Sequence, residues 1–258
     1  MQTSTIMTSN KLRHIGIGCA VAIFWIGVWT LLCLWVNKSL LMPLPYPWDV
    51  ATALCDLVCR GDFWADVAYS LFRIILGFAM AVGIGSLLAV LTVRFRALHA
   101  IFAPLLSVIR AVPVASFIFL AFLWIAPDAM PTFIAFLMVM PLVWENIRQG
   151  IMQTDVKLLE MAQVFRLSRA QRFRLVWFPS VRPYWSAALS TGFGFAWKSG
   201  VAAEIICTTG RSIGAQIAAS KSTLHYAEVF ASTVIVVVLS VVLEWLVHRL
   251  FREREVAV

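Results

Sequence analysis

Among the charged side chains inside otherwise apolar stretches of the sequence, three are candidates for a role in transport: Lys198, Glu204 and Arg110. A charge in the bilayer costs about 3 kcal/mol on insertion scales, so such residues usually face the interior of a helix bundle or pair with an opposite charge. Lys198 either attracts an anionic solute through a pore, snorkels, or forms a structural ion pair, for which Glu204 of a second copy is one partner. Arg110 is followed by Pro113, which can kink the helix and let the arginine reach water. Pathway and snorkelling roles both fit Arg110.

Glu204 lies close to the end of its apolar stretch, 184–207. An interfacial, solvated or locally bonded carboxylate fits this position, and so does a gate or a docking contact for an outer protein. Lys198 and Glu204 are separated by about 1.7 helical turns, so they point to different faces of one helix. A direct pair between them within the helix is therefore not expected.

No set of residues indicates catalysis or metal binding. The four histidines are dispersed, and the sequence has no G-x-x-x-x-G-K-[ST], G-x-S-x-G or H-E-x-x-H pattern. The five cysteines lack the paired spacing of a metal site. We therefore expect no catalytic residue, no metal ligand and no cofactor in this chain, and no binding of ATP by it.

Composition predicts an all-α polytopic membrane protein. Of the 258 residues, 61% are hydrophobic and only 13% are charged, about half the share found in soluble domains. The apolar residues form runs near the roughly 20 residues that cross a bilayer. About six spans are predicted, at 15–36, 71–93, 101–126, 131–147, 184–207 and 227–249. Together they predict one membrane domain over 15–250, between a cytoplasmic tail at 1–14 and another at 251–258.

The distribution of Lys and Arg predicts the orientation. Fourteen of these cations lie on one side of the predicted spans and four on the other. Because cytoplasmic loops carry the excess of positive charge, both termini and the 150–183 loop are predicted to be cytoplasmic. The net charge of +8 is explained by this topology, and no nucleic-acid partner is expected.

The 150–183 loop is polar and strongly basic in a chain that is otherwise apolar. Asp155 can cap a first short helix, and Ser168 with Gln171 can form a capping box for a second helix over 169–177. Pro179 and Pro183 are expected to end this second helix. The first helix has an apolar stripe, made of Leu158, Leu159, Ala162 and Phe165. Such helices either lie on acidic headgroups or dock onto a protein.

The spacing within this loop resembles the EAA loop of the membrane subunits of binding-protein-dependent ABC importers. The matching residues are Glu160, Met161, Ala162, Arg166, Val176, Phe178 and Pro179. The resemblance implies that these residues form a coupling loop that docks into the ATP-hydrolysing subunit. Met161 replaces an Ala of the family pattern, and Arg166 replaces a Gly. Because Arg adopts positive φ only with strain, the turn is expected either to change shape or to continue helically toward Ser168.

A second resemblance, to importer permeases of the nitrate, sulfonate and taurine class, covers nearly all of 41–250. It is carried by FGFAWKSGVAAEI at 193–205, with Arg211-Ser-Ile-Gly214 after it, by Leu71–Phe78 and by Arg110–Pro113. It implies a type I importer permease fold, alternating access and a location in the bacterial inner membrane. The implied partners are a second copy of the chain, two cytoplasmic ATPase subunits that bind ATP and Mg, an outer substrate-binding protein and membrane lipids.

The predicted function is therefore a permease for a small solute, and the cations Lys198 and Arg110 favour an anion such as a sulfonate, taurine or nitrate. A secondary carrier, a membrane-embedded enzyme and a pure scaffold subunit are the alternatives. A carrier often has inverted repeats, which this sequence lacks. An enzyme needs a clustered acid, base or metal set, and a scaffold does not need charges in its spans.

Overall fold

The computed structural model describes residues 3–39 and 43–252, and every regular element in this part of the chain is helical. This confirms the predicted all-α class. The elements are α1 (Thr3–Ser39), α2 (Pro47–Cys59), α3 (Gly61–Arg94), α4 (Arg96–Ala111), α5 (Val114–Ala121), η1 (Pro127–Ala129), α6 (Met130–Met152), α7 (Val156–Val164), α8 (Arg169–Arg172), the π-helical η2 (Phe173–Trp177), α9 (Phe178–Cys207), α10 (Ile213–Ser222) and α11 (Tyr226–Arg252).

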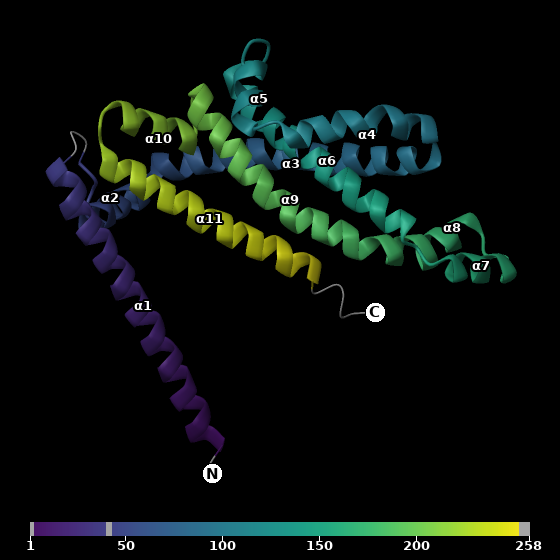
Figure 1. Ribbon diagram of the computed structural model, residues 1–258, viewed down its shortest axis with the longest axis horizontal. Coiled ribbons are helices and arrows are strands. Elements are labelled where there is room, and N and C mark those ends of the chain that lie inside the picture. The colour runs from purple at the N-terminus through teal and green to yellow at the C-terminus, as the bar shows by residue number, and fades with distance from the viewer. Residues whose placement is uncertain (1–2, 40–42, 253–258) are drawn as a thin grey trace.

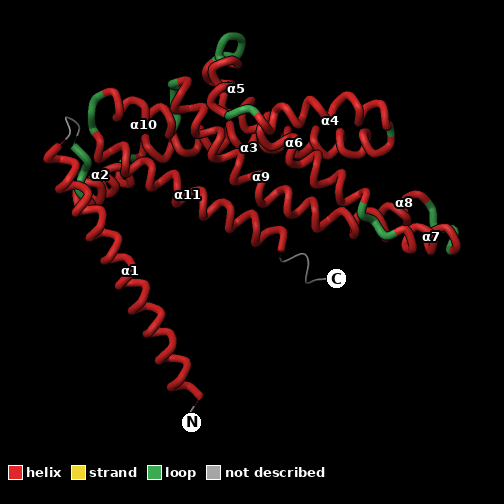
Figure 2. The backbone as a smooth tube through the Cα atoms, viewed as in Figure 1, coloured by secondary structure: helices red, strands yellow, loops and turns green. Residues whose placement is uncertain are grey.

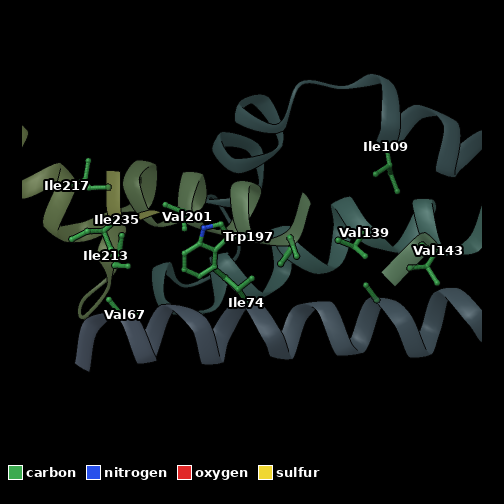
Figure 3. Close-up of a cluster of buried hydrophobic side chains, with 14 of the residues drawn as sticks. Val67, Ile74, Ile109, Val139, Val143, Trp197, Val201, Ile213, Ile217 and Ile235 are labelled. Carbon is green, nitrogen blue, oxygen red and sulfur yellow. The ribbon is translucent and has the colours of Figure 1, made fainter. Parts of the chain in front are cut away.

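The core of the bundle is formed by α3, α6 and α9, which pack along much of their lengths (Figure 1). Figure 3 shows part of this core, including Ile74 of α3, Val139 of α6 and Trp197 of α9. A small residue allows the closest approach, since a Cβ added at Gly77 would lie 2.2 Å from the Thr132 carbonyl oxygen of α6. Small residues at helix interfaces are typical of membrane bundles, where backbone contact replaces hydrophobic driving force.

Four described helices are long and apolar enough to cross a membrane. They correspond to Ala20–Lys38, Gly61–Arg94, Pro127–Met152 and Tyr226–Arg249, and the bent pair α4–α5 makes a fifth if it counts as one span. The predicted span 184–207 lies within α9, a helix of 30 residues that is less apolar because it carries small and polar residues along much of its length. Helix α9 is largely enclosed by the rest of the bundle, which explains how it tolerates them.

The third predicted span, 101–126, is not one continuous helix. The chain breaks between α4 and α5, and the two helices meet at an angle of 104°. Figure 2 shows the short loop at this break. Pro113 is the cause, because a proline disfavours helical backbone in the residue before it, and Val112 is extended (φ −79°, ψ 133°). The predicted kink at Pro113 is thus confirmed, but it is large enough to redirect the chain.

Helix α1 extends away from the other helices (Figure 1). Its C-terminal end is held by Asn37, whose side-chain oxygen accepts a hydrogen bond from the backbone N–H of Leu44 at 2.7 Å. The predicted tail at 1–14 is already helical from Thr3. Most of the second predicted tail, residues 253–258, lies outside the described residues.

Candidate functional site

The predicted loop between two apolar helices is present and lies between α6 and α9. Asp155 caps α7 by accepting a hydrogen bond from the backbone N–H of Lys157 at 2.9 Å. The predicted capping box also forms, with Gln171 N–H bonded to Ser168 Oγ at 3.3 Å and Ser168 N–H bonded to Gln171 Oε1 at 2.9 Å. Two short helical segments are therefore anchored by the residues that the sequence indicated.

Arg166 occupies the turn between α7 and α8 with a positive φ of 50°. Leu167 N–H bonds to the Ala162 carbonyl oxygen and Arg166 N–H to the Gln163 carbonyl oxygen, both at 3.0 Å. This is the bonding pattern of a Schellman motif, in which Gly is the preferred residue at the left-handed position. Arg166 thus adopts the turn that a Gly would allow, so both expectations, a turn of changed shape and a continuous helix toward Ser168, are wrong.

The second predicted helix, 169–177, consists of one turn of α8 followed by the π-helical η2. The expectation that Pro179 and Pro183 end it is wrong, since both lie inside α9. Phe178 N–H bonds to the Phe173 carbonyl oxygen five residues back, so the wide π turn carries the chain directly into α9. Pro179 stands in the first turn of α9, where a missing N–H is tolerated.

The seven residues that match the EAA pattern divide into two groups by burial. Ala162 of α7 and Val176 of η2 are buried, at 0% and 2% exposure, and these two elements contact each other. The others are exposed on its surface: Glu160, Met161, Arg166, Phe178 and Pro179. Large apolar side chains are exposed beside them, namely Val164, Phe165, Phe173 and Leu175. Within the described chain nothing covers this surface.

Lys198 pairs with Glu244 of α11, with 3.3 Å between Nζ and Oε1. Ser240 donates a hydrogen bond to the same carboxylate oxygen at 3.0 Å. The pair borders a cleft of about 530 Å³ between α9 and α11, which Thr191 and His248 also line. The Lys198 side chain is 70% exposed, on an accessible face of α9 that also exposes Thr191 and Phe195. The partner suggested from sequence, Glu204 of a second copy, is replaced by Glu244 of the same chain.

Glu204 is fully buried at the junction of α9 and α10, so the interfacial, solvated interpretation is wrong and the locally bonded one holds. Its Oε2 accepts hydrogen bonds from Ser70 Oγ at 2.8 Å and from the backbone N–H of Gly214 at 3.3 Å. Ser70 Oγ in turn accepts a hydrogen bond from Ile213 N–H at 3.0 Å. A carboxylate at the start of α10 is stabilised by the unpaired N–H groups of its first turn. Glu204 thus ties α3 and α9 to the start of α10.

Arg73 reinforces the same end of the molecule. It forms an ion pair with Asp128 of η1 at 3.2 Å, and its side chain is only 17% exposed. Asp128 also accepts a hydrogen bond from Gly210 N–H at 3.3 Å, and Arg211 pairs with Asp66 at 3.3 Å. The turn between α9 and α10 is therefore held to α3 by an ion pair and to η1 by a hydrogen bond.

Arg110 is not brought to the Lys198 cleft, since it lies exposed at the end of α4. Sequence reasoning missed Glu244, although a carboxylate within the predicted span 227–249 is the same signal that singled out Lys198. It also missed Ser70, which carried no signal because serines are common in membrane helices. Among the residues that the structure describes, no group of three or more His, Cys, Asp and Glu is placed to hold a metal ion.

The fold combines apolar spanning helices with a loop of two short helices at one end. At the other end, ion pairs and hydrogen bonds hold the α9–α10 turn in place. These features are those of a membrane-embedded transport subunit. The chain belongs to the family described as binding-protein-dependent transport system inner membrane components, whose model matches residues 81–255. It is therefore a permease subunit of an ABC importer, a multi-pass protein of the inner membrane and not an enzyme. Membership also implies an ATPase and a substrate-binding protein as partners.

Several named proteins are similar to this chain. The nitrate import permease protein NrtB of Leptolyngbya laminosa is 29% identical over 221 residues, covering 80% of this chain and 75% of that protein. A Bacillus subtilis (strain 168) protein named as an aliphatic sulfonates transport permease, SsuC, is 26% identical over 212 residues, covering 81% and 76%. A structure described as the crystal structure of an amino acid ABC transporter with histidines matches with a TM-score of 0.62 and 17% identity, covering 76% of this chain and 94% of that chain. This structural match supports the type I permease fold.

Proposed function

We propose that two copies of this chain form the translocation path for a small anion such as a sulfonate, taurine or nitrate. The observation that carries this proposal is the Lys198 side chain, which is 70% exposed and borders the α9–α11 cleft. A cation left accessible within a membrane bundle is expected to face water or a partner and not lipid, because lipid exposure is costly. Similarity to permeases named for nitrate and for aliphatic sulfonates favours an anionic solute.

Two cytoplasmic ATPase subunits dock onto the exposed surface of the loop between α6 and α9, and an outer protein delivers the solute. The exposed apolar side chains of that loop, together with Glu160 and Arg166, supply the docking surface. ATP and Mg are bound by the ATPase and not by this chain. The excess of Lys and Arg at this end supports an orientation with both termini and the loop in the cytoplasm.

Movement of the loop is transmitted through α9. This helix follows η2 without a break and is about 45 Å long at 1.5 Å per residue. Tyr184 donates a hydrogen bond to Gln153, which joins the first turns of α9 to the start of the loop. Because α9 also carries Lys198 and Glu204, displacement of its loop end shifts the cleft and the α9–α10 turn together. Alternating access then follows from tilting of α9 when the ATPase dimer closes.

The test is anion uptake by the assembled importer in proteoliposomes, with its ATPase and binding protein. Lys198→Ala is expected to lower uptake at least tenfold, whereas Lys198→Arg retains most of it. Glu160→Ala is expected to leave assembly of the permease intact but to reduce stimulation of ATP hydrolysis by loaded binding protein. Unchanged uptake by a normally assembled Lys198→Ala importer would contradict the pathway role. The absence of any ATPase bound to the loop would contradict the docking role.

A further inference from the structure

A second cavity lies at the loop end of the bundle, away from the Lys198 cleft. It has a volume of about 680 Å³, within the range of roughly 300–1,000 Å³ typical of ligand pockets. The ends of α3, α6 and α9 nearest to α7 and α8 form it, together with η2 (Figure 1). None of the residues assigned to the Lys198 cleft lines it. We call it the loop-end cavity.

The walls of the loop-end cavity are apolar. Val90 and Val93 come from the last turns of α3, Ile147 and Ile151 from the end of α6, and Phe173 from η2. Val90, Val93 and Ile147 lie in the last turns of the predicted spans 71–93 and 131–147, so the apolar walls lie at the ends of these spans nearest to the loop. An acyl chain can reach apolar walls at this level from the adjoining bilayer.

Two arginines line the same cavity, Arg94 at the end of α3 and Arg182 in the second turn of α9, and no carboxylate lines it. Arg94 forms no ion pair with any residue that the structure describes, and its guanidinium lies 5.4 Å from the centroid of the Phe95 ring. Trp177 and Trp185 also line the cavity, and tryptophan is typical of the headgroup level. The cavity thus combines apolar walls at the ends of the predicted spans with two cations beside them.

We propose that the loop-end cavity binds a phospholipid with a net negative headgroup. The arginines contact the phosphate and an acyl chain fills the space between the valines and isoleucines. Basic pockets between spanning helices at the cytoplasmic side are suited to acidic lipids by charge, and each buried methylene adds apolar contact. Such a lipid would also pack on Phe173 and Trp177 of η2, the π turn that joins the coupling loop to α9.

The test is native mass spectrometry of the full-length chain, purified in mild detergent, delipidated, and titrated with phosphatidylglycerol or phosphatidylcholine. One tightly bound phosphatidylglycerol per chain is expected, with at least tenfold weaker binding of phosphatidylcholine. The double substitution Arg94→Gln with Arg182→Gln is expected to weaken phosphatidylglycerol binding at least tenfold. The matched control, Arg96→Gln with Arg174→Gln, removes the same charge from exposed neighbours that do not line the cavity, and binding should stay within twofold.

Val90→Trp supplies an independent test because it fills the cavity from α3 and leaves the charge unchanged. It is expected to displace phosphatidylglycerol as strongly as the double substitution, with the helical circular dichroism retained. Equal phosphatidylglycerol binding by the wild type, the arginine variant and Val90→Trp would overturn the proposal. So would equal affinity of the wild type for the two lipids, or efficient disulfide formation between copies carrying Val90→Cys, which would show that a second copy covers the cavity.

Discussion

At the scale of single residues, Arg166 holds a backbone conformation that its side chain disfavours. The left-handed region costs a non-glycine residue roughly 1–2 kcal/mol, and Arg166 has φ 50° within a Schellman turn. Its side chain is exposed, and it forms no ion pair with the residues that the structure describes. Strain held at an exposed residue suggests a functional reason for keeping it. A contact between its positive charge and an acidic group on the ATPase is such a reason.

Replacing Arg166 with Gly should therefore stabilise the isolated permease and weaken its coupling. The thermal midpoint of the purified chain is expected to rise, consistent with relief of about 1 kcal/mol of strain. Arg172→Gly is the control, because Arg172 is helical and Gly lowers helix stability by about 1 kcal/mol there. Thermal denaturation followed by circular dichroism distinguishes the two. A lower midpoint for Arg166→Gly would show that the turn is not strained by its side chain.

Glu244 sets how strongly the Lys198 cleft holds an anion, since its carboxylate competes for the same ammonium group at 3.3 Å. Glu244→Gln is expected to tighten binding of the transported anion severalfold and to slow its turnover, because transport needs a site weak enough to release its ion. Uptake measured against anion concentration gives both quantities. Glu228→Gln is a control on the same helix, where the carboxylate bonds Ser220 and does not line the Lys198 cleft. Weaker anion binding by Glu244→Gln than by the wild type would rule out competition between Glu244 and the anion for the Lys198 ammonium group.

At the scale of the elements, the junction between α9 and α10 depends on direct contact of two backbones. A Cβ at Gly214 would lie 2.3 Å from Cβ of Glu204, so Gly214→Ala must push α10 away from α9. We expect this to destabilise the protein by about 1–3 kcal/mol and to speed hydrogen exchange in residues 208–222. Gly210→Ala is the matched control, because its nearest neighbour would be Asp128 Oδ1 at an ordinary 3.7 Å. Equal exchange in the two variants would mean that the junction tolerates the added methyl group.

Helices were easier to predict from the sequence than the connections between them. Five of the six predicted spans fall within single helices, because long apolar runs indicate them directly. The π turn at 173–177 has no compositional signature, so the sequence predicts a helix end at Pro179 where the structure has a helix that continues. The contact between Ser70 and Glu204 joins residues 134 positions apart, and only the packed bundle reveals it. Pro113 does predict a break in the helix, but the 104° angle between α4 and α5 depends on how α5 packs.

At the scale of the whole molecule, α3 runs from the end that carries α2 to the end near the coupling loop (Figure 1). Lys and Arg are concentrated in the loop and beside it, and the positive-inside rule supports the proposal that this end is cytoplasmic. The opposite end carries Cys55 and Cys59 of α2, both exposed free thiols. In the proposed orientation, these cysteines are native reporters of the outer face. Orientation can therefore be tested without altering the bundle.

A membrane-impermeant maleimide should label Cys55 and Cys59 in right-side-out vesicles. In a background with both changed to Ser, Gln163→Cys in the exposed surface of α7 should be labelled only in inverted vesicles. For each site, the extent of labelling is expected to differ at least tenfold between right-side-out and inverted vesicles, because the charged reagent cannot cross the bilayer. The same background without an added cysteine gives the signal of the remaining thiols, of which Cys33 and Cys207 are buried. Labelling of Gln163→Cys from the outside would reverse the topology and would place the coupling loop out of reach of any cytoplasmic ATPase.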